Sequence, residues 1–155
     1  MTQTISFVGN VPVHYAQIVL VSGAGDFVDP LVAFAGQRNE LCGAGVSGAL
    51  FLVTATHTGD VRIEIRVETE QPKLADWDEV VEVSYRPTTP SVTLLGWDGE
   101  VFARFELSAP SYRARWSRQG PREQGRELER CRLELWPAGV ADEEILRLRP
   151  EADTR

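Results

Sequence analysis

The stretch DVRIEIRVET, residues 60–69, decides the fold class. Its apolar side chains recur at every second position from Val61 to Val67, and charged side chains fill the positions between them. Because successive side chains of a strand point to opposite faces, this pattern predicts a strand with one buried face and one wet face. Such alternation is typical of antiparallel sheets, since parallel strands covered on both faces are apolar throughout.

Similar runs lie on both sides of this stretch, each ended by Gly, Pro, Asp or Asn. The predicted strands are residues 13–22, 48–56, 60–69, 77–86, 91–97, 100–107, 111–118 and 130–137. About eight strands with little room for helical crossovers predict an all-β fold, an antiparallel β-sandwich, for which a jelly roll is one fitting topology. We expect a single domain over residues 1–150 and a frayed tail at 151–155.

Several connections can be predicted from local residue chemistry. Gly59 stands where a tight turn needs a positive φ, so strands 48–56 and 60–69 are expected to form a hairpin. A second hairpin turn is predicted at WDGE, residues 97–100. ADEEILRLR, residues 141–149, fits a short C-terminal helix, with acids first and bases last, or a last short strand. The polar stretch at 118–129 is expected to be a mobile loop.

The stretch DWDEVVEVSYR, residues 76–86, holds four carboxylates beside a tryptophan. Alternate positions from Trp77 are mostly apolar and those from Asp78 mostly polar, which predicts a half-buried strand with Asp78 and Glu82 on its wet face. Glu79 interrupts the apolar face, where a carboxylate is costly unless it is paired with a cation. Either the strand begins at Val80, or Glu79 meets an arginine such as Arg113 or Arg115.

The composition is that of a globular protein. The 155 residues are 43% hydrophobic and 25% charged, enough to bury a core without metals or disulfides. The start, MTQTISFVGN, lacks the features of a secretory signal, and no apolar run approaches the roughly 20 residues that span a bilayer. We therefore expect a cytoplasmic protein in which Cys42 and Cys131 are two reduced thiols.

The sequence offers little for catalysis. Nucleophilic catalysis needs a base beside the nucleophile, and the two histidines, His14 and His57, accompany no nucleophile motif. The glycine-rich residues 35–49 match neither the Walker nor the dinucleotide-binding pattern. No His and Cys stand at metal-ligand spacing. We expect no catalytic residues, no cofactor, no metal and no enzyme activity.

The charge distribution favours a protein partner. The net charge of −7 argues against direct binding of nucleic acid, which needs an excess of cations. The acidity is central, because residues 58–110 carry eleven acids and five bases. The candidate partner-binding residues are Asp76, Asp78, Glu82, Asp98 and Glu100. Such a surface suits an inhibitor or immunity-type partner of a basic protein such as a nuclease.

The four tryptophans favour a different function. Their indole rings could line a groove that binds a small ligand or a carbohydrate. The candidate ligand-binding residues are Trp77, Trp97, Trp116 and Trp136. The sequence alone also leaves a homodimer open, since a sandwich has edge strands that can pair.

Three segments carry a resemblance to a known family. They are VHYAQIVLVSG (13–23), FAGQRNELCGAGVSGALFLVTATHTGDVRIEIRVE (34–68) and CRLELWPA (131–138). Their layout, with Tyr15, Gln17, Gln37 and Trp136, resembles the competence protein J family of DNA-entry nuclease inhibitors. DWDEVVEVSY and WPAG are similar to uncharacterised actinobacterial proteins of the same size. The first resemblance implies a cytosolic, non-enzymatic protein that binds and blocks a nuclease.

Overall fold

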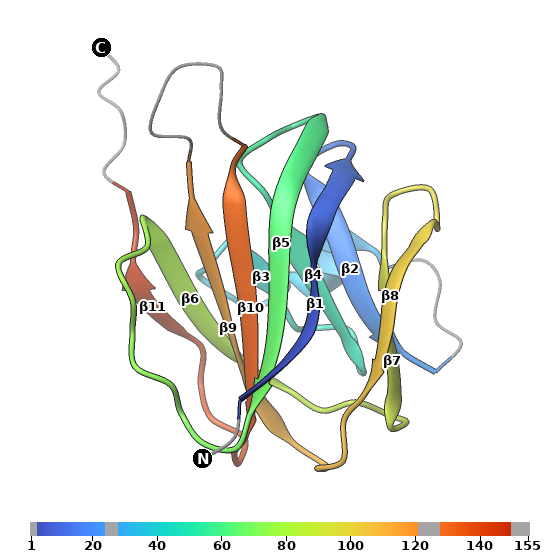
Figure 1. The fold of residues 1–155 in the computed structure, drawn as a ribbon. Coiled ribbons are helices and arrows are strands. Elements are labelled where there is room, and N and C mark those ends of the chain that lie inside the picture. Colours follow the sequence, from blue (N-terminus) through green and yellow to red (C-terminus); the bar gives the residue numbers. More distant parts are fainter. Residues whose placement is uncertain (1–2, 24–27, 121–127, 150–155) are drawn as a thin grey trace.

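The computed structural model describes residues 3–23, 28–120 and 128–149 (Figure 1). In these ranges it contains β1 (Gln3–Val13), β2 (Gln17–Ser22), α1 (Pro30–Ala33), β3 (Cys42–Gly43), β4 (Ala49–Val53), β5 (Gly59–Glu68), β6 (Glu79–Tyr85), β7 (Ser91–Leu95), β8 (Val101–Glu106), β9 (Tyr112–Gln119), β10 (Arg130–Pro137) and β11 (Glu144–Arg147). The predicted all-β sandwich is confirmed, although the prediction missed β1, β3 and α1.

The strands form two sheets. Sheet A has the order β1-β5-β10-β9-β6-β11, and sheet B has the order β3-β4-β2-β7-β8. All neighbouring pairs that the structure describes are antiparallel except β5 and β10, which run parallel. The sheets are thus mainly antiparallel, as predicted, and the one parallel pair joins two strands far apart in the chain (Figure 1).

The two predicted hairpins have different outcomes. The predicted turn at 97–100 is confirmed, because it joins the antiparallel pair β7 and β8, and Gly99 has a positive φ of 86°. The hairpin between residues 48–56 and 60–69 is wrong, because β4 belongs to sheet B and β5 to sheet A. The chain crosses between the sheets at this point, and Gly59 (φ 144°) begins β5 beside Val13 of β1.

The C-terminal helix expected at 141–149 is wrong, and the strand alternative is correct. Residues 144–147 form β11 and pair with β6, so this segment extends sheet A. The loop expected at 118–129 falls largely on residues 121–127, and the frayed tail on 150–155, both outside the described residues.

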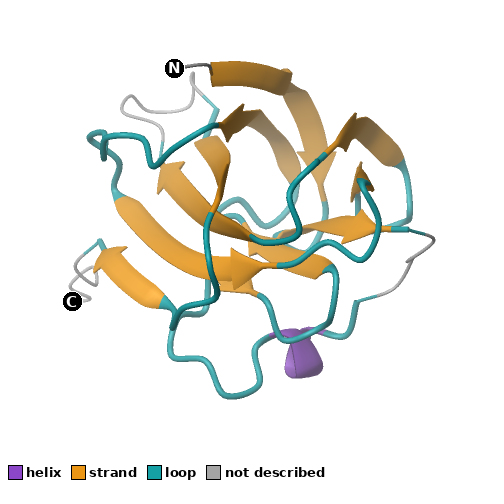
Figure 2. Ribbon diagram, turned by 90° about the horizontal axis from the view of Figure 1, so that it is seen from below, coloured by secondary structure: helices purple, strands orange, loops and turns teal. Residues whose placement is uncertain are grey.

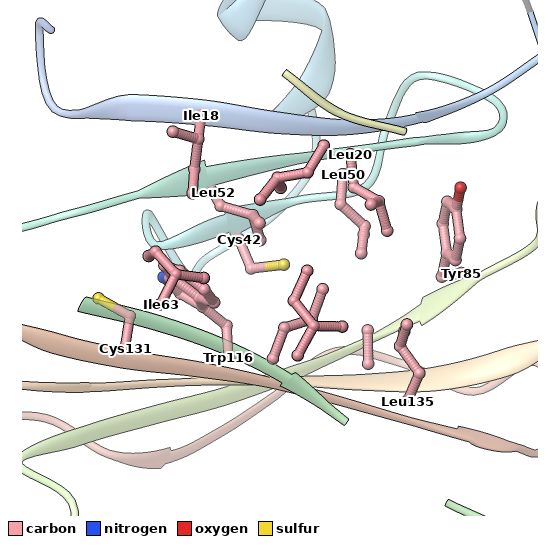
Figure 3. Packing of buried hydrophobic residues seen from close by; sticks show 14 of the residues in the cluster. Ile18, Leu20, Cys42, Leu50, Leu52, Ile63, Tyr85, Trp116, Cys131 and Leu135 are labelled. Carbon is pink, nitrogen blue, oxygen red and sulfur yellow. The ribbon is translucent and has the colours of Figure 1, made fainter. Parts of the chain in front are cut away.

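The core lies between the inner faces of the two sheets (Figure 3). Sheet B contributes Ile18, Leu20, Leu50 and Leu52, and sheet A contributes side chains such as Trp116. The predicted apolar face of β6 is confirmed, since Val81, Val83 and Tyr85 all belong to this core. Cys42 and Cys131 are buried free thiols, as expected.

Sheet B is also covered on its outer face. Val19, Val21 and Phe51 form a second apolar cluster there with Ala33 of α1, and Figure 2 shows this helix outside the sheets. Burial on both faces explains why β2 and β4 are continuously apolar instead of alternating. Among the described residues, no helix has the length and apolar character needed to span a bilayer.

Candidate partner-binding surface

The five predicted acidic residues do not form one surface. Asp76 is fully exposed, with Oδ1 3.9 Å from Nη1 of Arg147. Asp78 is partly buried, forms an ion pair with Arg149 and accepts a hydrogen bond from the amide of Gly120. Glu82 is buried in sheet A. Asp98 and Glu100 are exposed in the β7–β8 turn of sheet B.

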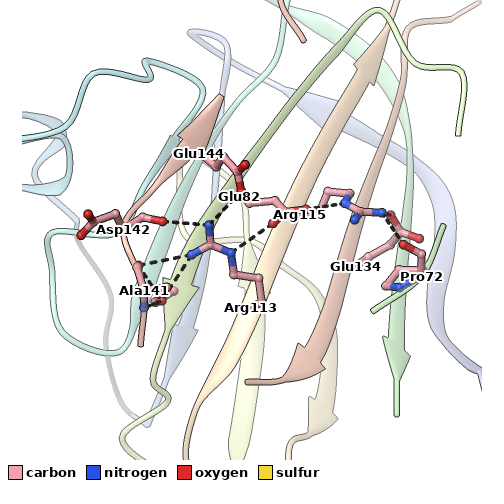
Figure 4. A network of polar contacts seen from close by, with 9 residues as sticks. Pro72, Glu82, Arg113, Arg115, Glu134, Ala141, Asp142 and Glu144 are labelled. Atoms are coloured by element: carbon pink, nitrogen blue, oxygen red, sulfur yellow. Dashed lines mark hydrogen bonds and ion pairs between the residues drawn. The ribbon is translucent and has the colours of Figure 1, made fainter. Parts of the chain in front are cut away.

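The prediction that Glu82 lies on a solvent-exposed face of its strand is wrong, because this residue is buried. The side chain is 5% exposed and lies between two arginines (Figure 4). Arg113 Nε donates to one carboxylate oxygen at 3.1 Å, and Arg115 Nε donates to the other at 2.8 Å. Arg115 Nη1 also lies 3.7 Å from Glu134. Glu82 is therefore part of a buried ion network and cannot present its charge to a partner.

The segment at 69–78, here called the strap, lies against arginines on the same face of sheet A. Arg115 Nη1 donates to the carbonyl of Pro72 at 3.0 Å, and Arg147 Nη1 donates to that of Trp77 at 2.7 Å. The guanidinium of Arg132 lies 5.0 Å from the centroid of the Trp77 ring. These contacts hold the strap against the outer face of sheet A. Alternation alone could not predict this cover, because the strap has no regular pattern.

Burial perturbs one member of this network. Desolvation raises the pKa of Glu134 to about 7, although Arg115 and Arg132 lower it and Glu68 raises it further. The carboxyl of Glu134 is therefore partly protonated near pH 7. Glu79, for which the sequence allows two environments, is the first residue of β6. It pairs with an arginine, but the partner is Arg118, whose Nε donates to Oε1 of Glu79 at 2.9 Å.

The four tryptophans are scattered and do not line one groove. Trp116 is in the core, where its Nε1 donates to the carbonyl of Val53 at 3.0 Å. Trp77 and Trp136 are buried, and each stacks against an arginine of the outer face of sheet A. Trp97 alone is exposed, at 53%. None of the four lines the hollow of about 400 Å³ between residues 36–44, 83–84 and 141–143.

Three connections meet around Trp97 at one end of the sandwich (Figure 1, upper end). They are the β1–β2 turn at 14–16, the β4–β5 connection at 54–58 and the β7–β8 turn at 96–100. The ring centroids of Tyr15 and Trp97 are 4.9 Å apart, and those of Tyr15 and His57 are 5.3 Å apart. The ring centroid of His14 lies 6.2 Å from that of Trp97. Each connection thus contributes a ring to one cluster.

The central ring of this cluster is held by an unusual backbone. Tyr15 and Ala16 both have φ of 58°, in the left-handed region that non-glycine residues rarely enter. The amide of Ala16 donates to the carbonyl of His57 at 2.7 Å, and its carbonyl accepts from the amide of Thr54 at 3.0 Å. Strained residues persist where their surroundings over-determine them, often at functional sites. Here the strain places Tyr15, 56% exposed, on the surface.

A buried carboxylate fixes the second connection. Glu129 is 2% exposed and accepts hydrogen bonds from the amides of Ala55 and Thr56, both at 2.8 Å. It lies one residue before β10, so it ties the turn that carries His57 to sheet A. The rings are therefore held by main-chain contacts on two sides.

The three connections around Trp97 carry acidic side chains and no Lys or Arg. Residues 14–16, 54–58 and 96–100 contain two acids, Asp98 and Glu100, and no Lys or Arg. We call the set His14, Tyr15, His57, Trp97, Asp98 and Glu100 the aromatic–acidic patch. Of the predicted site residues, the structure brings Trp97, Asp98 and Glu100 together here. Local sequence patterns do not indicate that His14, Tyr15 and His57 would join them, because they do not record where the chain crosses between sheets.

The described residues include no group of three or more His, Cys, Asp or Glu side chains placed to hold a metal ion. His57 Nδ1 lies 2.8 Å from the hydroxyl of its neighbour Thr58, an exposed contact. The surface thus offers rings and carboxylates in a fixed arrangement, which is the chemistry of recognition.

Comparison with solved structures identifies proteins that share this fold. No protein-family model matches the chain, and no curated protein matches it. Among solved structures, ComJ from Bacillus subtilis, an inhibitor of the DNA degrading activity of NucA, is similar with a TM-score of 0.67 and 10% identity over 89% of this chain and 100% of that one. The product of crocagin biosynthetic gene J is similar with a TM-score of 0.59 and 12% identity over 90% and 100%. At these identities the similarity establishes that the chain has the fold of these two proteins.

Proposed function

We propose that this protein is a non-catalytic binding protein that inhibits a basic protein such as a nuclease. The observation that carries the proposal is the aromatic–acidic patch, where Tyr15 and Trp97 stand exposed beside Asp98 and Glu100. The nuclease inhibitor ComJ shares the fold, which supports the inhibitor class without identifying the partner.

The patch has the two components that protein recognition needs. Tyr and Trp are enriched among the residues that dominate binding energy, and they contribute most when they are rigid. The ring contacts and the two backbone hydrogen bonds of Ala16 supply that rigidity. The carboxylates attract a basic surface and speed the encounter without adding much affinity of their own. A basic partner with an apolar area inside its cationic surface is the complement.

The other three predicted partner-binding residues contribute less to the attraction of a basic partner. Asp76 is exposed on the strap, but Asp78 is already paired with Arg149 and Glu82 with two arginines. An ion pair within the protein cancels most of the field that a partner would feel. We therefore assign the electrostatic attraction chiefly to Asp98 and Glu100.

The experiment uses a NucA-type nuclease from the organism that encodes this chain. The nuclease is mixed with plasmid DNA and increasing amounts of the protein, and DNA degradation is followed on gels while calorimetry measures complex formation. We expect inhibition near one equivalent and an affinity that falls between 50 and 300 mM salt, as charge attraction is screened. Complete degradation with a tenfold excess at 50 mM salt, and no heat of binding, would refute the proposal.

A DNA-only control separates inhibition of the enzyme from protection of its substrate. The protein is expected not to retard plasmid DNA in a gel shift, because its net charge is −7. Retardation of DNA at inhibitory concentrations would assign the effect to DNA binding and contradict the proposed mode.

A further inference from the structure

A hollow of about 260 Å³ opens beside Trp97, on the outer side of sheet B. Its lining residues are Gln17, Ile18, Val19, Val28, Pro30, Gly96 and Trp97. Ligand sites for drug-sized molecules measure roughly 300–1,000 Å³. The hollow is smaller than these, so its size fits one side chain of a partner better than a separate small molecule.

The walls of the hollow offer apolar surface and an aromatic ring, and a carboxylate lies next to them. Val19, Val28 and Pro30 supply an apolar surface, and Trp97 supplies an exposed aromatic ring. A carboxylate lies next to this lining: Asp98 follows Trp97 in the chain, and its Oδ1 lies 3.6 Å from the position that a Cβ on the lining residue Gly96 would take. The same oxygen accepts a hydrogen bond from the amide of Glu100 at 3.1 Å, which orients the carboxylate. None of the described lining residues is Lys or Arg.

The indole is packed against two neighbouring rings. Tyr15 and His14 contact it at centroid distances of 4.9 and 6.2 Å. A Cβ on Gly96 would lie 2.8 Å from the ring of Phe102, so a larger residue would require that ring to move. The ring and the carboxylate are therefore presented together by one turn whose shape is set by packing.

An apolar wall, an aromatic face and a carboxylate together match a long side chain that ends in a cation. The aliphatic stem of such a residue packs on apolar surface while its charged end stays accessible. A guanidinium stacks on aromatic faces and binds a carboxylate through two parallel hydrogen bonds, whereas an ammonium does neither as well. We propose that the hollow is the subsite for an arginine side chain of the basic partner. This inference rests on the proposed function and adds the residue that the patch recognises.

The first test uses short peptides and the isolated protein. Acetyl-Gly-Arg-Gly-amide is titrated to 20 mM while the indole Nε1–H signal of Trp97 is followed by NMR, beside matched peptides that carry citrulline, lysine or norleucine. Citrulline keeps the shape of arginine and removes its charge. We expect saturable shifts with the arginine peptide, weaker ones with lysine, and none with citrulline. No shift with arginine, or equal binding of citrulline or norleucine, overturns the inference.

The second test uses variants whose folding is checked by the same spectra. Trp97→Leu keeps an apolar wall without the ring, and Asp98→Asn keeps the oxygen that accepts from Glu100 without the charge. Each is expected to weaken arginine-peptide binding roughly two- to fivefold or more, as loss of a cation–π contact or an ion pair at an exposed site does. Glu106→Gln, an exposed acid at the other end of β8 and outside the aromatic–acidic patch, is the matched control and should change binding less. Equal losses in all three variants contradict a subsite at Trp97 and Asp98.

The two proposals can fail separately. If wild-type protein inhibits the nuclease and Trp97→Leu inhibits it with unchanged affinity, the arginine subsite is refuted and the proposed function stands. If the arginine peptide binds at Trp97 but no NucA-type nuclease is bound or inhibited, the subsite stands as a property of the surface and the nuclease assignment fails.

Discussion

Glu82 lies between two arginines, and its removal would leave both guanidinium groups buried without their carboxylate. Breaking a buried ion pair on one side costs about 3–5 kcal/mol. Arg113 and Arg115 would keep only the more distant carboxylates of Glu144 and Glu134, at 3.9 and 3.7 Å. We therefore expect Glu82→Ala to lower the free energy of unfolding by several kcal/mol in urea titrations. Glu100→Ala, at an exposed turn, should stay within about 0.5 kcal/mol of wild type. Similar stability of the two variants would mean that the network in Figure 4 contributes little.

Glu134 should make stability depend on pH in the neutral range. Because burial raises its pKa to about 7, the folded protein keeps a proton that the unfolded chain, with an ordinary Glu pKa of about 4.3, has released. The stabilisation is complete below about pH 4.3 and is lost as the pH rises toward 7. We expect the urea midpoint of wild type to fall between pH 5 and 8, and that of Glu134→Gln to fall less.

Other carboxylates act outside this window and serve as an internal check. Burial raises the pKa of Glu143, but hydrogen bonds from the amides of Arg38 and Asn39 outweigh it and hold the pKa below its ordinary value. The stability contributed by Glu143 is therefore lost only as the pH falls below about 4.5. A slope between pH 5 and 8 that survives in Glu134→Gln would have to come from another group.

The β1–β2 turn tests whether the patch is held under strain. The Cβ of Ala16 costs about 1–2 kcal/mol in the left-handed region, and the extra freedom that glycine gives the unfolded chain returns about 0.4–1 kcal/mol of this. Ala16→Gly should therefore stabilise the protein slightly, by about 0.5 kcal/mol, in thermal and urea unfolding. Ala114→Gly, in the buried centre of β9, should destabilise it by about 1 kcal/mol. Equal losses at both sites would argue against strain in the turn.

At the level of elements, strand positions were predictable and strand partners were not. Alternation identified β5 and the inner face of β6, because side-chain burial follows the two-residue period. The parallel partner of β5 is β10, more than 60 residues later in the chain, and no local pattern records such a pairing. The burial of Glu82 was equally unpredictable, because both of its arginine partners come from β9, and the strap that accepts a hydrogen bond from one of them has no periodicity.

For the whole molecule, the same limit applies to the candidate site. Residue type was enough to identify Trp97, Asp98 and Glu100 as surface candidates, and the predicted turn placed them on one hairpin. Their association with Tyr15 and His57 depends on the crossing of the chain from β4 in one sheet to β5 in the other. The sequence therefore indicated which kinds of side chain the site contains, whereas the fold determines which of them lie together.

The last prediction separates the two groups of acids through association kinetics. Asp98→Asn with Glu100→Gln removes two charges from the patch, and Glu70→Gln with Asp76→Asn removes two exposed charges from the strap region. Both doubles keep the side-chain shapes, so both should fold with stability close to wild type. Under the proposed function, the patch variant binds the nuclease more slowly and with a weaker salt dependence, while its dissociation rate changes little, because steering acts on the encounter. Surface plasmon resonance at 50 and 300 mM salt measures all three quantities. If the strap variant is slowed as much as the patch variant, the attraction comes from the general acidity of the chain; if it is slowed more, the partner approaches the strap, and the patch is not the surface that it meets first.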